Sequence, residues 1–216
     1  MTALQLDTDF AITDERSLRG LFEPTHALAI QKCQDNLGEH AREFIRRSPF
    51  LCIGTQNLEG AADVSPRGDP PGFVKVLDGR TLAIPDRPGN NRLDTLSNIL
   101  ANPNVGLLFI VPGFDDTLRV NGSATLSRDP ELLKLMTIAD RTPKLGIVVE
   151  VREVFMHCAK AFRRSRLWDP AHFQVRGEMP SLIKIILDET TGAPASGDEM
   201  RKMDEQLERD YRRTLY

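Results

Sequence analysis

The sequence predicts an α+β protein in which a mainly antiparallel sheet or small barrel is flanked by helices. Six or seven apolar runs of strand length lie in the middle of the chain, and most are joined by short turns. Strands joined in this way pair antiparallel, whereas the helical patterns lie at the two ends and in two short insertions. This segregation of strands and helices argues against a doubly wound fold.

Composition and charge exclude several classes of protein. The chain has 216 residues, of which 40% are hydrophobic and 27% charged, as in ordinary globular proteins. Its net charge of -3 argues against a general nucleic-acid binder. No apolar window is long enough for a membrane helix, and the first residues lack a basic signal-peptide start, so we expect a cytoplasmic protein.

Three cysteines, Cys33, Cys52 and Cys158, lie far apart within apolar patterns. We interpret them as reduced core residues rather than as a disulfide set or a zinc site. No histidine or cysteine cluster has metal-ligand spacing, so the sequence predicts no metal. His157 is the nearest candidate for an acid or base, although a strand histidine facing the core is the simpler interpretation.

The first half of the chain begins with a helical pattern over residues 25–47. Its apolar face recurs every three or four residues, and Ser48-Pro49 ends it. Two hairpins follow, with a proline- and glycine-rich segment at 66–72 that we expect to be irregular. The predicted strands are Phe50–Thr55, Ala61–Ser65, Phe73–Leu77 and Thr81–Ile84. A loop over residues 85–91 then leads to a short helix that Asn102-Pro103 stops.

The second half continues with strands over residues 105–111, 118–126 and 144–158. The second of these alternates apolar and polar residues, as a half-buried strand does. Asp129-Pro130 opens a helix before the third strand. Residues 159–180 are expected to be irregular, and residues 181–187 fit either a helix or a strand. The last predicted helix, 196–216, starts with a capping box and carries an apolar stripe.

Arg67 lies in a stiff loop, between a proline and a glycine. Prolines lower the entropy lost when such a loop is ordered, and glycines let the backbone approach a ligand. The loop could therefore direct Arg67 at an anion, or it could be a rigid connector with a solvated arginine.

Arg92 lies at the start of the short helix, after Asn90 and Asn91, either of which would be a good N-cap. A cation is electrostatically misplaced there unless an anion also binds, because a helix N-terminus carries partial positive charge. Main-chain N–H groups and a guanidinium together make a phosphate site. The alternative is an ordinary surface arginine.

Residues 160–170 combine four cations with the only tryptophan of the chain. This pattern suits a flat, anionic small molecule, but a solvated loop or a nucleic-acid contact remains open.

The order and spacing of these segments resemble the pyridoxamine 5'-phosphate oxidase-like family of FMN-binding split β-barrels. The resemblance runs over about 25–170 and rests on Ser65-Pro66-Arg67, Asn91-Arg92, Asn102-Pro103 and the strand residues Arg119-Val120-Asn121-Gly122. A bacterial subgroup with SPRGDPPGF and RRSRLWDP segments is most similar. The resemblance implies an α+β, mainly β, six-to-seven-stranded antiparallel split barrel with N- and C-terminal helices.

The resemblance also implies a homodimer with FMN at the interface and a small-molecule substrate. The implied FMN-binding residues are Ser65, Pro66, Arg67, Gly68, Ile84, Pro85, Asn91, Arg92 and Thr117. The residues expected to close the site, from the same subunit or its partner, are Lys160, Arg163, Arg164, Ser165 and Trp168. The chain ends in a charged helix instead of the arginine-bearing segment of the true oxidases, which argues against pyridoxamine 5'-phosphate as substrate.

Three regions follow from this interpretation: an N-terminal helical region (1–48) that packs on the barrel, the FMN-binding barrel (49–170) and a C-terminal extension ending in a helix (171–216). The expected function is that of an FMN-dependent oxidoreductase. The alternative is a protein that binds FMN, haem or another cofactor for storage or sensing without catalysis.

Overall fold

The computed structural model describes residues 5–192, 194 and 196–216. The chain divides into two compact units, residues 1–33 and residues 34–216. In the described part of the first unit, the helices are short: a 3-10 turn at Thr8–Phe10, α1 at Glu15–Arg19 and α2 at Ala27–Gln31, none with a buried residue.

The prediction of one helix over residues 25–47 is wrong. The chain leaves the helical conformation after α2 and re-enters it in α3 (Glu39–Arg47), where Phe44 and Ile45 are buried. Between the helices the backbone bonds to the sheet instead: Gln34 exchanges two main-chain hydrogen bonds with Val154, at 3.0 and 2.7 Å. Tertiary pairing therefore overrides a helical apolar pattern here.

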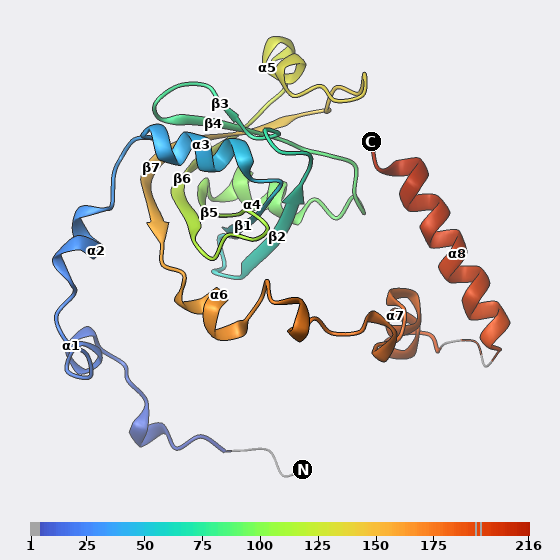
Figure 1. Cartoon of the computed structure of the whole chain (residues 1–216), viewed down its shortest axis with the longest axis horizontal. Coiled ribbons are helices and arrows are strands. Elements are labelled where there is room, and N and C mark those ends of the chain that lie inside the picture. The colour runs from blue at the N-terminus through green and yellow to red at the C-terminus, as the bar shows by residue number, and fades with distance from the viewer. Residues whose placement is uncertain (1–4, 193, 195) are drawn as a thin grey trace. The chain divides into compact units, whose positions relative to one another are not determined.

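One seven-stranded antiparallel sheet forms the centre of the second unit, in the order β2-β1-β5-β6-β7-β4-β3 (Figure 1). Its strands are β1 (Phe50–Gln56), β2 (Ala62–Gly68), β3 (Lys75–Val76), β4 (Thr81–Pro85), β5 (Asn104–Ile110), β6 (Thr117–Ser127) and β7 (Gly146–His157). The edge strands β2 and β3 do not pair with each other, so the sheet is not closed. The predicted antiparallel split barrel with flanking helices is confirmed.

The core lies inside this sheet and under α3. Residues Leu51, Ile53, Phe109, Val120 and Ile147 are fully buried there and come from four adjacent strands. In β6 the predicted alternation is present, with a register shift at Asn121/Gly122 against β7. A Cβ at Gly122 would collide with the main-chain oxygen of Glu150, so the close approach of β7 requires glycine at this point.

Helix α4 (Asp94–Ala101) follows β4 and packs on β1, β2 and β6. Thr95, Leu96 and Ile99 are its buried residues. Side-chain hydrogen bonds fix it further, because Asn98 Nδ2 donates to Thr55 Oγ1 at 3.1 Å and Thr95 Oγ1 donates to Asp63 Oδ2 at 3.3 Å. The start of α4 is therefore held beside β2. Helix α5 (Pro130–Leu135) begins at Asp129 and Pro130, as predicted.

After β7 the chain is more helical than predicted. Residues Lys160–Ser165 form α6, and short 3-10 turns follow at Pro170–His172 and Arg176–Glu178. Residues Leu182–Glu189 form helix α7, which decides between the two alternatives for this segment. Ser181 is its N-cap and accepts a hydrogen bond from the Lys184 N–H.

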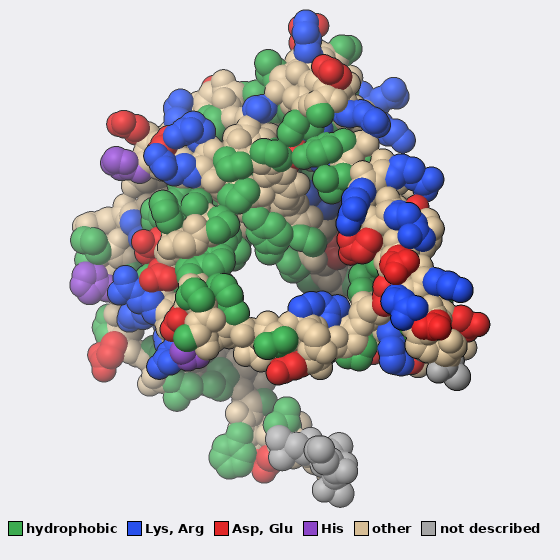
Figure 2. Space-filling model, turned by 45° about the vertical axis from the view of Figure 1, so that its right-hand side comes forward, with side chains coloured by type: hydrophobic (Ala, Val, Ile, Leu, Met, Phe, Trp, Pro, Cys, Tyr) green, Lys and Arg blue, Asp and Glu red, His purple; other side chains and the backbone are tan. Residues whose placement is uncertain are grey.

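Helix α8 (Gly197–Thr214) begins at the predicted cap, where Ser196 Oγ accepts from the Glu199 N–H at 3.5 Å. Charged side chains of both signs are interspersed along it (Figure 2), and several pair one turn apart, such as Arg201 with Asp198. The predicted apolar stripe is only partly buried, because Met200 is buried whereas Tyr211 and Leu215 are exposed.

The cysteines are free, but they are not core residues as predicted. Cys33 and Cys52 are half-buried and Cys158 is exposed. In the part of the chain that the structure describes, no helix is long and apolar enough to cross a membrane.

Candidate functional site

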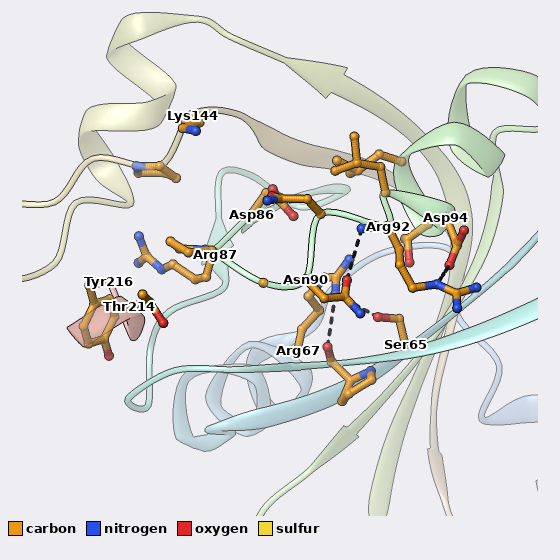
Figure 3. A pocket seen from close by; sticks show the side chains of 18 of the residues that line it. Ser65, Arg67, Asp86, Arg87, Asn90, Arg92, Asp94, Lys144, Thr214 and Tyr216 are labelled. Atoms are coloured by element: carbon orange, nitrogen blue, oxygen red, sulfur yellow. Dashed lines mark hydrogen bonds and ion pairs between the residues drawn. The ribbon is translucent and has the colours of Figure 1, made fainter. Parts of the chain in front are cut away.

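A cavity of about 740 Å³ opens between loops at one edge of the sheet (Figure 3). Its walls come from β2, from the β4–α4 loop with the start of α4, from the α5–β7 loop, and from the last residue of α8 together with Tyr216. The lining residues are 63–67, 86–96, 141–144, Thr214 and Tyr216. We refer to it as the loop cavity.

Arg67 lies on β2, which corrects the prediction that the chain is irregular from Pro66 onward. Residues 66–68 pair with β1, with Pro66 opposite Cys52 and Arg67 opposite Leu51. An edge strand accepts a proline because one side of the strand has no partner to bond. Since side chains alternate along a strand, Ser65 and Arg67 face the same side.

The Arg67 guanidinium is only partly satisfied by the protein. Its Nη1 donates to Ser65 Oγ at 2.8 Å and to the Pro66 main-chain oxygen at 3.2 Å. Its Nε is buried and has no hydrogen-bond partner among the described residues. A buried N–H without an acceptor is unfavourable, so this atom marks a place for an added acceptor group.

Asp86, at the end of β4, lies near Arg67 and is half-buried. Burial raises the pKa of the Asp86 carboxyl above its ordinary value, and the Arg67 charge opposes this effect. The ion pairs found among the described residues do not include Arg67.

Arg92 does not lie in the first turn of the helix, and neither Asn90 nor Asn91 is its N-cap. Helix α4 starts at Asp94, after Leu93 in a left-handed conformation with φ 62°. Asn90 instead accepts a hydrogen bond from the Arg92 N–H on its Oδ1, at 3.1 Å, as in an Asx turn.

The side chain of Arg92 is largely available. Its Nε donates to Asp94 Oδ2 at 2.7 Å, and 74% of the side chain remains exposed. Arg67, Asn91 and Arg92 all line the loop cavity, but the Arg92 guanidinium lies against Asp94 (Figure 3).

Arg87 and Asp69 form a buried ion pair that the sequence analysis did not identify. Arg87 Nε lies 2.6 Å from Asp69 Oδ2, with side-chain exposures of 15% and 1%. The Tyr216 hydroxyl donates to the other oxygen of Asp69 at 2.7 Å. No local pattern indicates these contacts, because their partners are 18 and 147 residues apart in the chain.

Several residues predicted to bind the cofactor are not brought to the loop cavity. Ile84, Pro85 and Thr117 have buried side chains in the sheet, and Gly68 is not among the lining residues. In β4 the last four residues are all buried, so neither face of the end of this strand is open to the cavity, and Thr117 is likewise buried at the start of β6.

The predicted site-closing residues form a separate surface next to the β5–β6 loop. They are Lys160, Arg163, Arg164, Ser165 and Trp168. None lines the loop cavity. Trp168 Nε1 donates to the Phe114 main-chain oxygen at 2.8 Å, and Arg163 Nε lies 3.0 Å from Asp115 Oδ2. Among the described residues no group of His, Cys, Asp or Glu has the arrangement of a metal site.

Comparison with known proteins gives one family. The family model described as pyridoxamine 5'-phosphate oxidase matches residues 37–158, which is more than half of the chain. No curated protein matches the sequence.

Several solved structures are similar over about half to two thirds of this chain. HupZ from Group A Streptococcus is 16% identical, covers 55% of this chain and 92% of its own, and has a TM-score of 0.45. An FMN-binding protein from Syntrophomonas wolfei subsp. wolfei is 12% identical, with coverages of 66% and 96% and a TM-score of 0.42. An FAD-binding protein from Mycobacterium smegmatis is 16% identical, with coverages of 57% and 97% and a TM-score of 0.41.

Proposed function

Because this chain belongs to the pyridoxamine 5'-phosphate oxidase family, we propose that its loop cavity binds FMN and that the protein is an FMN-dependent oxidoreductase acting on a small molecule. The observation that carries the proposal is the buried Nε of Arg67, a donor without an acceptor in the wall of the cavity. A phosphate oxygen would supply that acceptor, and charge-assisted hydrogen bonds of this kind are strong.

The residues around Arg67 fit a phosphate ester. Ser65 offers a hydroxyl beside the guanidinium, and Asn90, Asn91 and Arg92 of the 86–92 loop line the same cavity. Arg92 would exchange its exposed contact with Asp94 for the doubly charged phosphate. An exposed ion pair contributes little to stability, so breaking the Arg92–Asp94 contact costs little free energy.

Bound FMN supplies the redox chemistry, because its ring accepts a hydride from a donor. The protein's part is to hold the phosphate and to position the ring. Among the acidic groups of the lining, Asp94 bonds Arg92 and Asp63 bonds Thr95, which leaves Asp86 and Tyr216. A flavin carrier without catalysis is the alternative, since the described lining contains no histidine, cysteine or glutamate.

The first experiment is reconstitution of the full chain with FMN and with riboflavin, which lacks the phosphate. We expect FMN to bind more tightly. The Arg67→Met and Arg92→Met variants should each lose about 1–3 kcal/mol of FMN binding, roughly 5- to 150-fold, with little change for riboflavin. Binding is measured by titration of flavin fluorescence.

Arg128→Met is the matched control, because Arg128 is exposed and does not line the cavity. Equal affinities for FMN and riboflavin, or unchanged FMN binding by Arg67→Met, would contradict the phosphate assignment. Bleaching of the bound flavin by NAD(P)H, followed by turnover with an electron acceptor, would distinguish an oxidoreductase from a carrier.

We also propose a homodimer in which residues 160–168 of one subunit close the loop cavity of the other. In their own chain these residues are docked on the β5–β6 loop and lie outside the cavity lining. Sedimentation should give the mass of two chains, and Trp168→Ala should weaken FMN binding. The mass of one chain in the FMN-bound protein would contradict this assignment.

A further inference from the structure

Tyr216 is held at one end of the loop cavity by residues from distant parts of the chain. Its hydroxyl donates to Asp69 Oδ1 at 2.7 Å, and Arg87 Nε lies 2.6 Å from the other oxygen of that carboxylate. Asp69 follows β2, Arg87 lies in the β4–α4 loop and Tyr216 follows α8. A single buried carboxylate therefore joins segments that line the cavity from different sides.

The ring and the main chain of Tyr216 are also engaged. The Arg87 guanidinium carbon lies 5.8 Å from the centroid of the Tyr216 ring, within the range of a cation–π contact. Arg141 Nη1 donates to the main-chain oxygen of Tyr216 at 3.0 Å. We call Asp69, Arg87, Arg141 and Tyr216 the tyrosine latch.

The latch also fixes the loop that carries Arg92. Besides contacting Asp69, Arg87 donates from Nη2 to the Met136 main-chain oxygen at 2.8 Å. Arg87 thereby connects Asp69 and Tyr216 to the end of α5, where Met136 is the C-cap. The hydrogen bond to Asp69 raises the pKa of the Tyr216 hydroxyl above its ordinary value, so it remains a donor at neutral pH.

Helix α8 has few other anchors along its length. Met200, near its start, is its only buried residue among those described. Segments with few buried contacts open locally at low free energy. The contacts of Tyr216, which follows the other end of the helix, should therefore largely determine whether the end of α8 remains beside the cavity.

Figure 3 shows Tyr216 and Arg87 at one end of the cavity, and Arg92 and Asp94 at the other. We propose that Tyr216 is a positioning residue that closes the end of the cavity away from Arg92 and holds the 86–92 loop in its ligand-binding conformation. It lines the cavity and leaves its volume of about 740 Å³ open, so it acts as a wall and not as a plug.

The first test needs no ligand. Hydrogen exchange is measured on the full chain without flavin, for the wild type, Tyr216→Phe and Tyr211→Phe. Tyr211 is the matched control, since it is an exposed tyrosine of α8 outside the cavity. Loss of a hydrogen bond to a carboxylate should accelerate exchange of the 86–92 loop and the end of α8 by about 10-fold in Tyr216→Phe only. Unchanged exchange would overturn the proposal.

The second test rests on the proposed function and uses FMN. Release of FMN from Tyr216→Phe should be about 10-fold faster than from the wild type and from Tyr211→Phe, because the ring wall is no longer fixed. If exchange becomes faster but FMN release does not change, Tyr216 is not a wall of the ligand site and the proposal is wrong. If no variant binds FMN, the proposed function fails, and the exchange experiment alone decides whether the latch positions the loop.

Discussion

Arg87 and Arg92 lie five residues apart in one loop, line one cavity and differ in almost every physical respect. The Arg87 side chain is largely buried against Asp69 and the Met136 carbonyl, whereas the Arg92 side chain is exposed and its described hydrogen bond goes to the neighbouring Asp94. A buried, fully paired cation cannot leave its partner without a large penalty, whereas an exposed one can. Arg87 therefore stabilises the conformation of the loop, whereas Arg92 is available to bind a ligand.

The largest expected effect is on stability. Arg87→Met leaves Asp69 buried beside an apolar side chain, and we expect it to lower the free energy of unfolding by about 3–5 kcal/mol. Arg92→Met should change it by less than about 0.5 kcal/mol. Urea unfolding of both variants measures the difference.

The double variant Arg87→Met/Asp69→Leu sharpens this comparison. Replacing both members of a buried pair by apolar groups should recover much of the lost stability. Similar losses for Arg87→Met and Arg92→Met would show that burial of the two arginines does not distinguish them.

A smaller effect is expected at Asp86, which lies near Arg67 in the cavity lining. Its pKa in the folded protein is raised by burial above the ordinary 3.8. The folded state therefore binds this proton more tightly, and stability falls as the pH rises from 3.8 through the folded pKa. Asp86→Asn should be more stable than the wild type near neutral pH, by a small margin because solvent screens this half-exposed group, with no gain below the ordinary pKa.

Urea unfolding at several pH values measures this difference. A gain that persists at the acid end of the series would mean that the amide acts through packing or new hydrogen bonds and not through the carboxylate charge.

The smallest effect is expected at Asp94. Asp94→Asn removes the exposed partner of Arg92, so FMN binding should tighten by about twofold at low salt and the gain should shrink at high salt. Fluorescence titration at two salt concentrations measures it. Weaker FMN binding in this variant would mean that Asp94 orients Arg92 for the phosphate and does not compete with it.

The sequence predicts local features of this protein better than its distant contacts. The hairpins, the half-buried strand β6 and the helix stops at Ser48-Pro49 and Asn102-Pro103 follow from period, proline and turn chemistry, which act over a few residues. The predicted helix over 25–47 fails because a main-chain bridge from Gln34 to Val154 competes with it, and that competitor is 120 residues away.

The candidate site shows the same limit. Arg67 and Arg92 carry a local signal, a cation beside glycine, proline or asparagine, and both line the loop cavity. The left-handed Leu93 moves the helix start past Arg92, and a leucine gives no hint of that conformation. Asp69, Arg87 and Tyr216 are brought together only by the fold.

Pro66 has a consequence for how this molecule meets other chains. Its carbonyl oxygen accepts a hydrogen bond from the Arg67 side chain, so the polar main-chain groups of this residue face away from β1. On that outer rim a proline has no N–H to offer an incoming strand. The outer edge of β2 is thus unsuited to extension of the sheet by a strand of another molecule. It therefore stays accessible to solutes where Ser65 and Arg67 line the loop cavity.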